Sequence, residues 1–142
     1  MFVQEFVRIE APLRDVIVAF EDAVLPRFGD LLRDAWDGQG LETPVPYVPT
    51  AIGSRRDRDD GVAYAVSWPA TVPLFPAFDA DIELAEVADR VTHLEFAGLT
   101  HNPAVEPWSA EDRRVNRQSM VAIDRLLRSI ATMVECQLKS LR

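Results

Sequence analysis

The side chains best suited to proton transfer in this sequence are its two histidines, His93 and His101. An unperturbed imidazole titrates close to neutral pH, so either ring could act as a general base. His93 alternates with apolar residues and falls on the outer side of a predicted strand beside Glu95, which favours a surface histidine. His101 follows this strand in a polar segment, and it is the histidine that we retain as a catalytic candidate.

Asp79, Asp81 and Glu83 form an acidic row on one face of another predicted strand. Such a row could bind a cation or, if buried, supply an acid with a raised pKa, whereas an exposed row is simply solvated. One cysteine and two histidines give no recognised metal-ligand spacing. The single Gly-x-Gly, at 38–40, has no preceding strand and no third glycine. We therefore expect no metal and no cofactor.

Other side chains could also take part in chemistry. Arg113 opens the last predicted helix together with Arg114 and Arg117, where they could hold an acidic head group; a salt bridge to Glu111, Asp112 or an acid at the sheet edge is the alternative. Tyr64 lies on the inner face of a predicted central strand. Together with His101, Tyr64 and Arg113 could polarise a carbonyl group and move a proton. No catalytic motif accompanies them, so an enzyme is only one of the hypotheses that the sequence supports.

Composition limits the partners. The net charge of −8 disfavours nucleic acids and anionic membrane surfaces, which both require a basic footprint. The chain has no stretch that is long and apolar enough to span a bilayer. Its first residues lack a basic region ahead of an apolar run, so we expect no signal peptide and a cytoplasmic location. The length of 142 residues predicts a single domain over 1–142.

The last thirty residues must organise the fold, because 109–141 reads as one long amphipathic helix. Ser109 is a suitable N-cap, and Asp112 stands three residues later, as in a capping box. The apolar arc spans about half of the circumference, more than a surface helix needs. This arc contains Val115, Met120, Ala122, Ile123, Leu126, Leu127, Ile130, Met133, Val134, Leu138 and Leu141.

The preceding segments predict a sheet that can cover this helix. A strand over 2–10 is followed by two short helices, which Pro26 separates. The proline-rich segment 43–54 predicts an edge strand or loop, and 55–61 predicts a solvated hairpin tip. Residues 62–68, 78–87 and 91–98 alternate in polarity, and their short connections indicate antiparallel strands. A curved sheet around a helix leaves room for a ligand wherever side chains do not meet.

This order of elements resembles the START-like (SRPBCC) superfamily, the helix-grip proteins that include polyketide cyclases/dehydrases and lipid-transfer domains. The resemblance rests on VRIEAP at Val7–Pro12 before a helix, FDADIEL at Phe78–Leu84, and LEFAG at Leu94–Gly98, which leads through Asn102-Pro103 into the last helix. It implies an α+β helix-grip fold: a curved antiparallel sheet around a long C-terminal helix, with two short helices after the first strand. It also implies an apolar pocket, but no single activity.

The sequence therefore leaves three hypotheses for the function. The first is a protein that binds a small apolar or amphipathic molecule between the sheet and the last helix, without catalysis. The second is a cyclase- or dehydratase-like enzyme that uses Tyr64, His101 or Arg113. The third is an interaction or regulatory protein with a collapsed cavity, acting as a homodimer. The residues expected to contact a ligand are Tyr64, Trp68, Ile82, Phe96, Trp108, Met120, Ile123 and Leu127.

Overall fold

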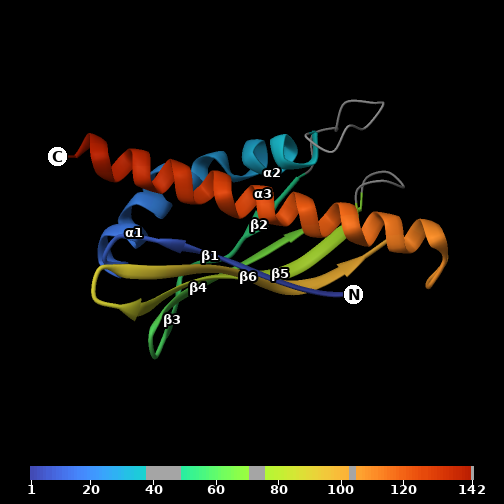
Figure 1. Cartoon of the computed structure of the whole chain (residues 1–142), viewed down its shortest axis with the longest axis horizontal. Helices are drawn as coiled ribbons and strands as arrows, with labels where there is room; N and C mark the ends of the chain where they lie inside the picture. The colour runs from blue at the N-terminus through green and yellow to red at the C-terminus, as the bar shows by residue number, and fades with distance from the viewer. Residues whose placement is uncertain (38–48, 71–75, 103–104, 142) are drawn as a thin grey trace.

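The computed structural model describes residues 1–37, 49–70, 76–102 and 105–141. One antiparallel sheet and a layer of helices face each other, and the longest helix crosses the whole length of the sheet (Figure 1). The elements in chain order are β1 (Phe2–Ile9), α1 (Leu13–Ala19), η1 (Phe20–Val24), η2 (Leu25–Arg27), α2 (Phe28–Asp37), β2 (Ala51–Ile52), β3 (Arg56–Arg58), β4 (Gly61–Trp68), β5 (Ala77–Ala88), β6 (Val91–His101) and α3 (Ala110–Ser140).

The sheet has the strand order β1-β6-β5-β4-β2, and the short strand β3 also pairs with β4. All pairs are antiparallel, as the alternating sequence predicts. The segment expected to be only a hairpin tip contains β3, which pairs with the first residues of β4. The proline-rich segment becomes a strand at β2, while 43–48 lies outside the described residues.

The predicted two short helices are present, but they are joined by a continuous helical run. The α1 helix passes into the π-helical turn η1 and then into the 3₁₀ turn η2, which contains Pro26. A proline nitrogen has no hydrogen to donate, so Pro26 interrupts the α-helical hydrogen bonding without ending the run. The helix α2 follows directly and buries Phe28, Leu32, Ala35 and Trp36.

The helix α3 has 31 residues and begins as expected, because the Ser109 hydroxyl accepts from the backbone N–H of Asp112 at 3.0 Å. Its buried face lies over β1 and β6 and beside α2 (Figure 1). The residues on this face are Val115, Ser119, Ala122, Ile123, Leu126, Leu127, Ile130, Ala131 and Val134. Across the described residues, no helix combines the length and apolar character needed to cross a bilayer.

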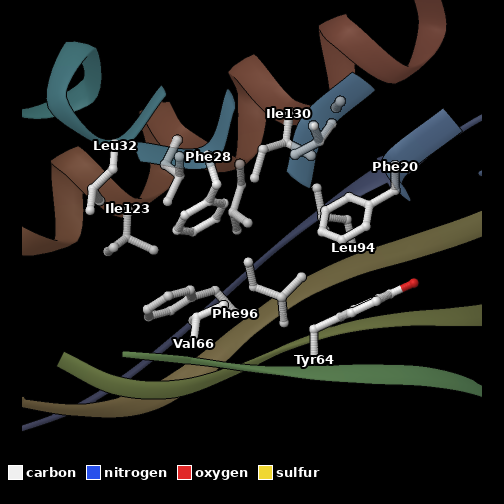
Figure 2. Packing of buried hydrophobic residues seen from close by; sticks show 14 of the residues in the cluster. Phe20, Phe28, Leu32, Tyr64, Val66, Leu94, Phe96, Ile123 and Ile130 are labelled. Atoms are coloured by element: carbon white, nitrogen blue, oxygen red, sulfur yellow. The ribbon is translucent and has the colours of Figure 1, made fainter. Parts of the chain in front are cut away.

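The core lies between this face of α3 and the inner face of the sheet (Figure 2). Alternate residues of β4, β5 and β6 point toward the helix because successive side chains of a strand point to opposite faces. The cross-strand rows can be read from the register. Tyr64, Ile82 and Phe96 form one row, and Val66, Ala80 and Gly98 form the next. A third row contains Trp68, Phe78 and Thr100.

Gly98 allows β5 and β6 to lie close together. A methyl group added to Gly98 would overlap the Cα and Cβ atoms of Ala80 and the carbonyl oxygen of Asp79. Strands β5 and β6 therefore approach more closely here than two side chains would allow. Their pairing at this position depends on a residue without a side chain.

We predict that Gly98→Ala destabilises the protein by about 2–3 kcal/mol, because fixed backbone atoms of β5 must move to admit the methyl group. Urea unfolding followed by circular dichroism measures the change. Gly53→Ala is the matched control, since its new methyl group would contact Ala65 Cβ at an ordinary 3.5 Å. Equal stabilities of the two variants would contradict the close approach of β5 and β6 at Gly98.

Candidate functional site

Six of the residues expected to contact a ligand do face the gap between sheet and helix. Tyr64, Trp68, Ile82 and Phe96 point from the sheet toward α3, and Ile123 and Leu127 point from α3 toward the sheet. Each is at most 2% exposed. A side chain that lines an open cavity keeps surface that water can touch, so these six side chains pack against protein atoms.

The aromatic side chains of this region lean over the smallest residues of the inner face. Phe78 is paired with Thr100, four residues along β6 from Phe96, a separation of about 13 Å along an extended strand. Their ring centroids are nevertheless only 5.7 Å apart. The two rings therefore meet above the intervening row, which contains Ala80 and Gly98.

Trp68 completes this aromatic cluster of Trp68, Phe78 and Phe96. Its ring centroid is 4.8 Å from that of Phe78 and 6.3 Å from that of Phe96, and its indole N–H donates to the carbonyl oxygen of Pro76 at 3.1 Å. The hydrogen bond fixes the orientation of the indole, whereas the two phenylalanine rings are held only by packing.

The residues around the aromatic cluster are smaller than those at the other end of the interior. The first buried positions of α3 are Val115, Ser119 and Ala122, whereas later ones are mostly leucine and isoleucine. The interior near the start of α3 is thus lined by smaller side chains of the helix.

The hydroxyl group of Tyr64 makes a polar contact with a residue of η1. Its hydroxyl donates to Glu21 Oε2 at 2.8 Å, and Arg55 Nη1 lies 3.5 Å from Glu21 Oε1. Burial is the main cause that raises the pKa of Tyr64, and the bond to the Glu21 carboxylate raises it further. Tyr64 is consequently a neutral hydrogen-bond donor that ties η1 to β4, not a base.

Two expected ligand contacts lie elsewhere: Trp108 is 87% exposed and Met120 is 44% exposed, so the expectation that they face the interior is wrong. Met120 lies at the margin of the apolar arc, beyond the part that the sheet covers. Trp108 has a left-handed backbone (φ 64°), which turns its side chain away. Its N–H donates to Asp112 Oδ2 at 3.1 Å, and its carbonyl oxygen accepts from Arg113 Nη1 at 3.0 Å.

The three catalytic candidates do not converge. His101 is the last residue of β6 and is exposed, rather than part of the connector, and Arg113 is an exposed residue that bonds the Trp108 carbonyl. Tyr64 lies in the row of Phe96, five residues along β6 from His101. His101 and Arg113 are thus exposed, whereas the Tyr64 side chain is buried and bonded to Glu21.

The remaining charged candidates lie on the outer face of the sheet. Asp81 Oδ1 accepts from Arg56 Nη2 at 2.6 Å, and Arg58 lies 3.7 Å from both Asp81 and Glu83. Asp81 and Glu83 of the acidic row are therefore paired with the arginines of β3, a pairing that depends on register and is not visible in the sequence. His93 also lies on this face, where its ring stacks on Phe6 with centroids 5.1 Å apart.

No family model and no curated protein sequence matches this chain. Solved structures match its fold. Ara h 8.0201 superposes with a TM-score of 0.53 at 14% identity, over 96% of this chain and 98% of that chain. The Zhui aromatase/cyclase from Streptomyces sp. R1128 superposes with a TM-score of 0.51 at 12% identity, over 97% and 95%. These similarities confirm the predicted helix-grip fold.

We predict that Tyr64→Phe lowers the free energy of unfolding by about 1 kcal/mol, the usual contribution of one hydrogen bond whose acceptor can still be solvated. Glu21→Gln is the matched control, because an amide oxygen can still accept from the phenol and most of the stability should remain. Urea unfolding at neutral pH gives both values. A larger loss in the Glu21 variant than in the Tyr64 variant would contradict the assigned bond.

The raised pKa of Tyr64 also predicts a dependence on pH. In the unfolded chain the phenol ionises near pH 10, whereas in the folded protein it stays neutral to higher pH. The stabilisation is therefore complete below about pH 10 and is lost as the pH rises toward the folded pKa. The stability difference between wild type and Tyr64→Phe should shrink between about pH 9 and pH 11, and a constant difference would contradict the assignment.

Proposed function

We propose that this chain binds one small apolar or amphipathic molecule between its sheet and the first half of α3. The observation that supports the proposal is the meeting of the Phe78 and Phe96 rings above Ala80 and Gly98. Two large rings that close over the smallest residues of a concave face can turn aside and leave a space bounded by aromatic surfaces. Concave, mostly apolar sites of this kind are typical of small-molecule binding.

A ligand in this space would replace contacts that the rings now make with each other. Ala80 and Gly98 would form the floor, and the rings of Trp68, Phe78 and Phe96 would form the walls. Each methylene group that the ligand buries contributes about 0.8 kcal/mol, so affinity should increase with apolar length until the space is full. The fold of Ara h 8.0201 and of the Zhui aromatase/cyclase is consistent with this role.

Two buried hydroxyl groups near the start of α3 support an amphipathic as well as a purely apolar ligand. Thr100 is buried in the row beside Phe78, and Ser119 is buried on α3. The Ser119 hydroxyl donates to the carbonyl oxygen of Val115 at 2.8 Å, which leaves its oxygen able to accept. A ligand with one hydroxyl or carbonyl group on an apolar body would suit these neighbours.

We predict that at least one of three ligand classes (an aliphatic acid, an aromatic polyketide or an isoprenoid) raises the melting temperature. A ligand at about 100 times its Kd stabilises a protein by about 2.7 kcal/mol, a rise of roughly 5–10 °C for a domain of this size. Ala80→Leu should abolish the rise, because its larger side chain fills the space over Gly98. Val62→Ile, on the same inner face but in the row of Leu84, should leave the rise intact.

Differential scanning fluorimetry, with isothermal titration calorimetry for any hit, measures these effects. No stabilisation by any of the three classes would contradict the proposal. Equal stabilisation of wild type and a folded Ala80→Leu variant would place the ligand elsewhere and would contradict the proposed site.

A further inference from the structure

The strand β1 leaves one line of backbone hydrogen-bonding groups unused at the edge of the sheet. Met1 and Thr100 exchange both backbone bonds, at 3.1 and 2.9 Å. Hydrogen-bonded pairs alternate along an antiparallel ladder, so every second residue of β1 bonds to β6. The residues between them direct their backbone N–H and C=O groups away from β6, toward the free edge. Phe2, Gln4, Phe6 and Arg8 are the residues that face outward.

The two edges of the sheet differ in how well they are protected. At the far edge lie β2, with only two residues, and β3, with three residues of which two are arginine. Short and charged strands of this kind resist pairing with another strand. The strand β1 has eight residues, no proline and no bulge against β6. Its outer side chains Phe2 and Phe6 are 60% and 58% exposed.

A groove of about 600 Å³ follows this free edge between β1 and α3. Phe6, Val7 and Arg8 line it on the strand side. On the helix side it is lined by Arg128, Ala131, Thr132 and Glu135. Arg128 and Glu135 lie seven residues apart, two turns on one side of α3, and they carry opposite charges at the two ends of the groove. Arg128 Nε donates to Asp124 Oδ2 at 2.9 Å, and its two Nη groups can still donate to a second carboxylate.

We propose that a second copy of this chain occupies the groove, its β1 pairing antiparallel with β1 of the first copy about a two-fold axis at Phe6. The two sheets then form one continuous sheet, and both α3 helices lie on the same side of it, antiparallel to each other. Because the axis passes beside Ala131 and Thr132, Arg128 of each copy faces Glu135 of the other. This reciprocal match of opposite charges is the reason for choosing a second copy as the occupant.

The register follows from the hydrogen-bonding pattern. With Phe6 on the axis, Phe6 lies opposite Phe6 and Gln4 lies opposite Arg8, so outward-facing residues of both copies exchange their backbone bonds. Phe2 of one copy lies opposite Glu10 of the other at each end of the β1–β1 interface. The pairing uses the only long edge of the described sheet, and the protected far edge prevents further growth. The product is a closed dimer, not a filament.

Sedimentation-velocity ultracentrifugation of the full chain tests the proposal directly. We expect wild type to be a dimer at about 100 μM, where even transient interfaces are populated. Phe6→Lys, which places two positive charges on the axis, should weaken association at least tenfold. Gln4→Pro, which removes an outward N–H and no backbone bond to β6, should do the same, and Gln4→Ala is its control, because both variants lose the side-chain bond from Gln4 Nε2 to Glu95 Oε1 of β6 (3.2 Å) but only the proline loses the N–H. Val18→Lys, at a 55%-exposed apolar position on α1, is the matched control and should remain dimeric.

A charge exchange tests the arrangement of the helices. Arg128→Glu or Glu135→Arg alone should weaken association about fivefold, because each change creates two like-charged contacts across the axis. The double variant Arg128→Glu/Glu135→Arg should associate clearly better than either single variant, since the charges across the axis are again opposite. The loss of the Arg128–Asp124 pair within α3 is common to Arg128→Glu and the double variant, so their difference reports the contact across the axis. Circular dichroism of every variant confirms that the fold is retained.

Three results would overturn the proposal. One is a wild-type protein that stays monomeric at about 100 μM. Another is a dimer that folded Phe6→Lys and Gln4→Pro variants leave intact. The last is a double charge variant that associates no better than either single variant, which would place the helices elsewhere. The ligand experiments do not bear on these results, because the groove lies outside the interior.

Discussion

The packing of the apolar face of α3 onto the inner face of the sheet is the constraint on which the rest of the structure depends. The buried face of this 31-residue helix is too broad for a flat sheet to cover. Within the inner face of the sheet, Gly98 allows β6 to approach Ala80 of β5 closely. A position without a side chain thus contributes to the surface on which the helix packs.

The two proposals concern different parts of this arrangement. The rings of Phe78 and Phe96 meet above the row of Ala80 and Gly98, where we propose that a ligand binds. Because α3 lies on the inner side of β1, the outer edge of that strand remains open beside a groove. The ligand hypothesis concerns the space between the sheet and α3, and the dimer hypothesis concerns the free edge of β1.

Much of the architecture was predictable because it is local in the sequence. Periodicity identified α3, the strands and their inner faces, and Ser109 marked the start of the last helix. What could not be predicted depends on register or on backbone conformation. The left-handed backbone that exposes Trp108 has no local signal in a non-glycine residue. The meeting of Phe78 and Phe96 follows from strand pairing, which composition and spacing do not determine.

The most direct test of the central claim is a nuclear Overhauser spectrum of the ligand-free protein with labelled phenylalanine rings. Centroids 5.7 Å apart bring the ring protons of Phe78 and Phe96 within range of a cross-peak. We expect this cross-peak because the two rings meet, although their backbone positions are about 13 Å apart along the extended strands. If the two rings show no cross-peak while the strand pairing of β5 and β6 is intact, they do not close over Ala80 and Gly98, and the account of the interior is wrong.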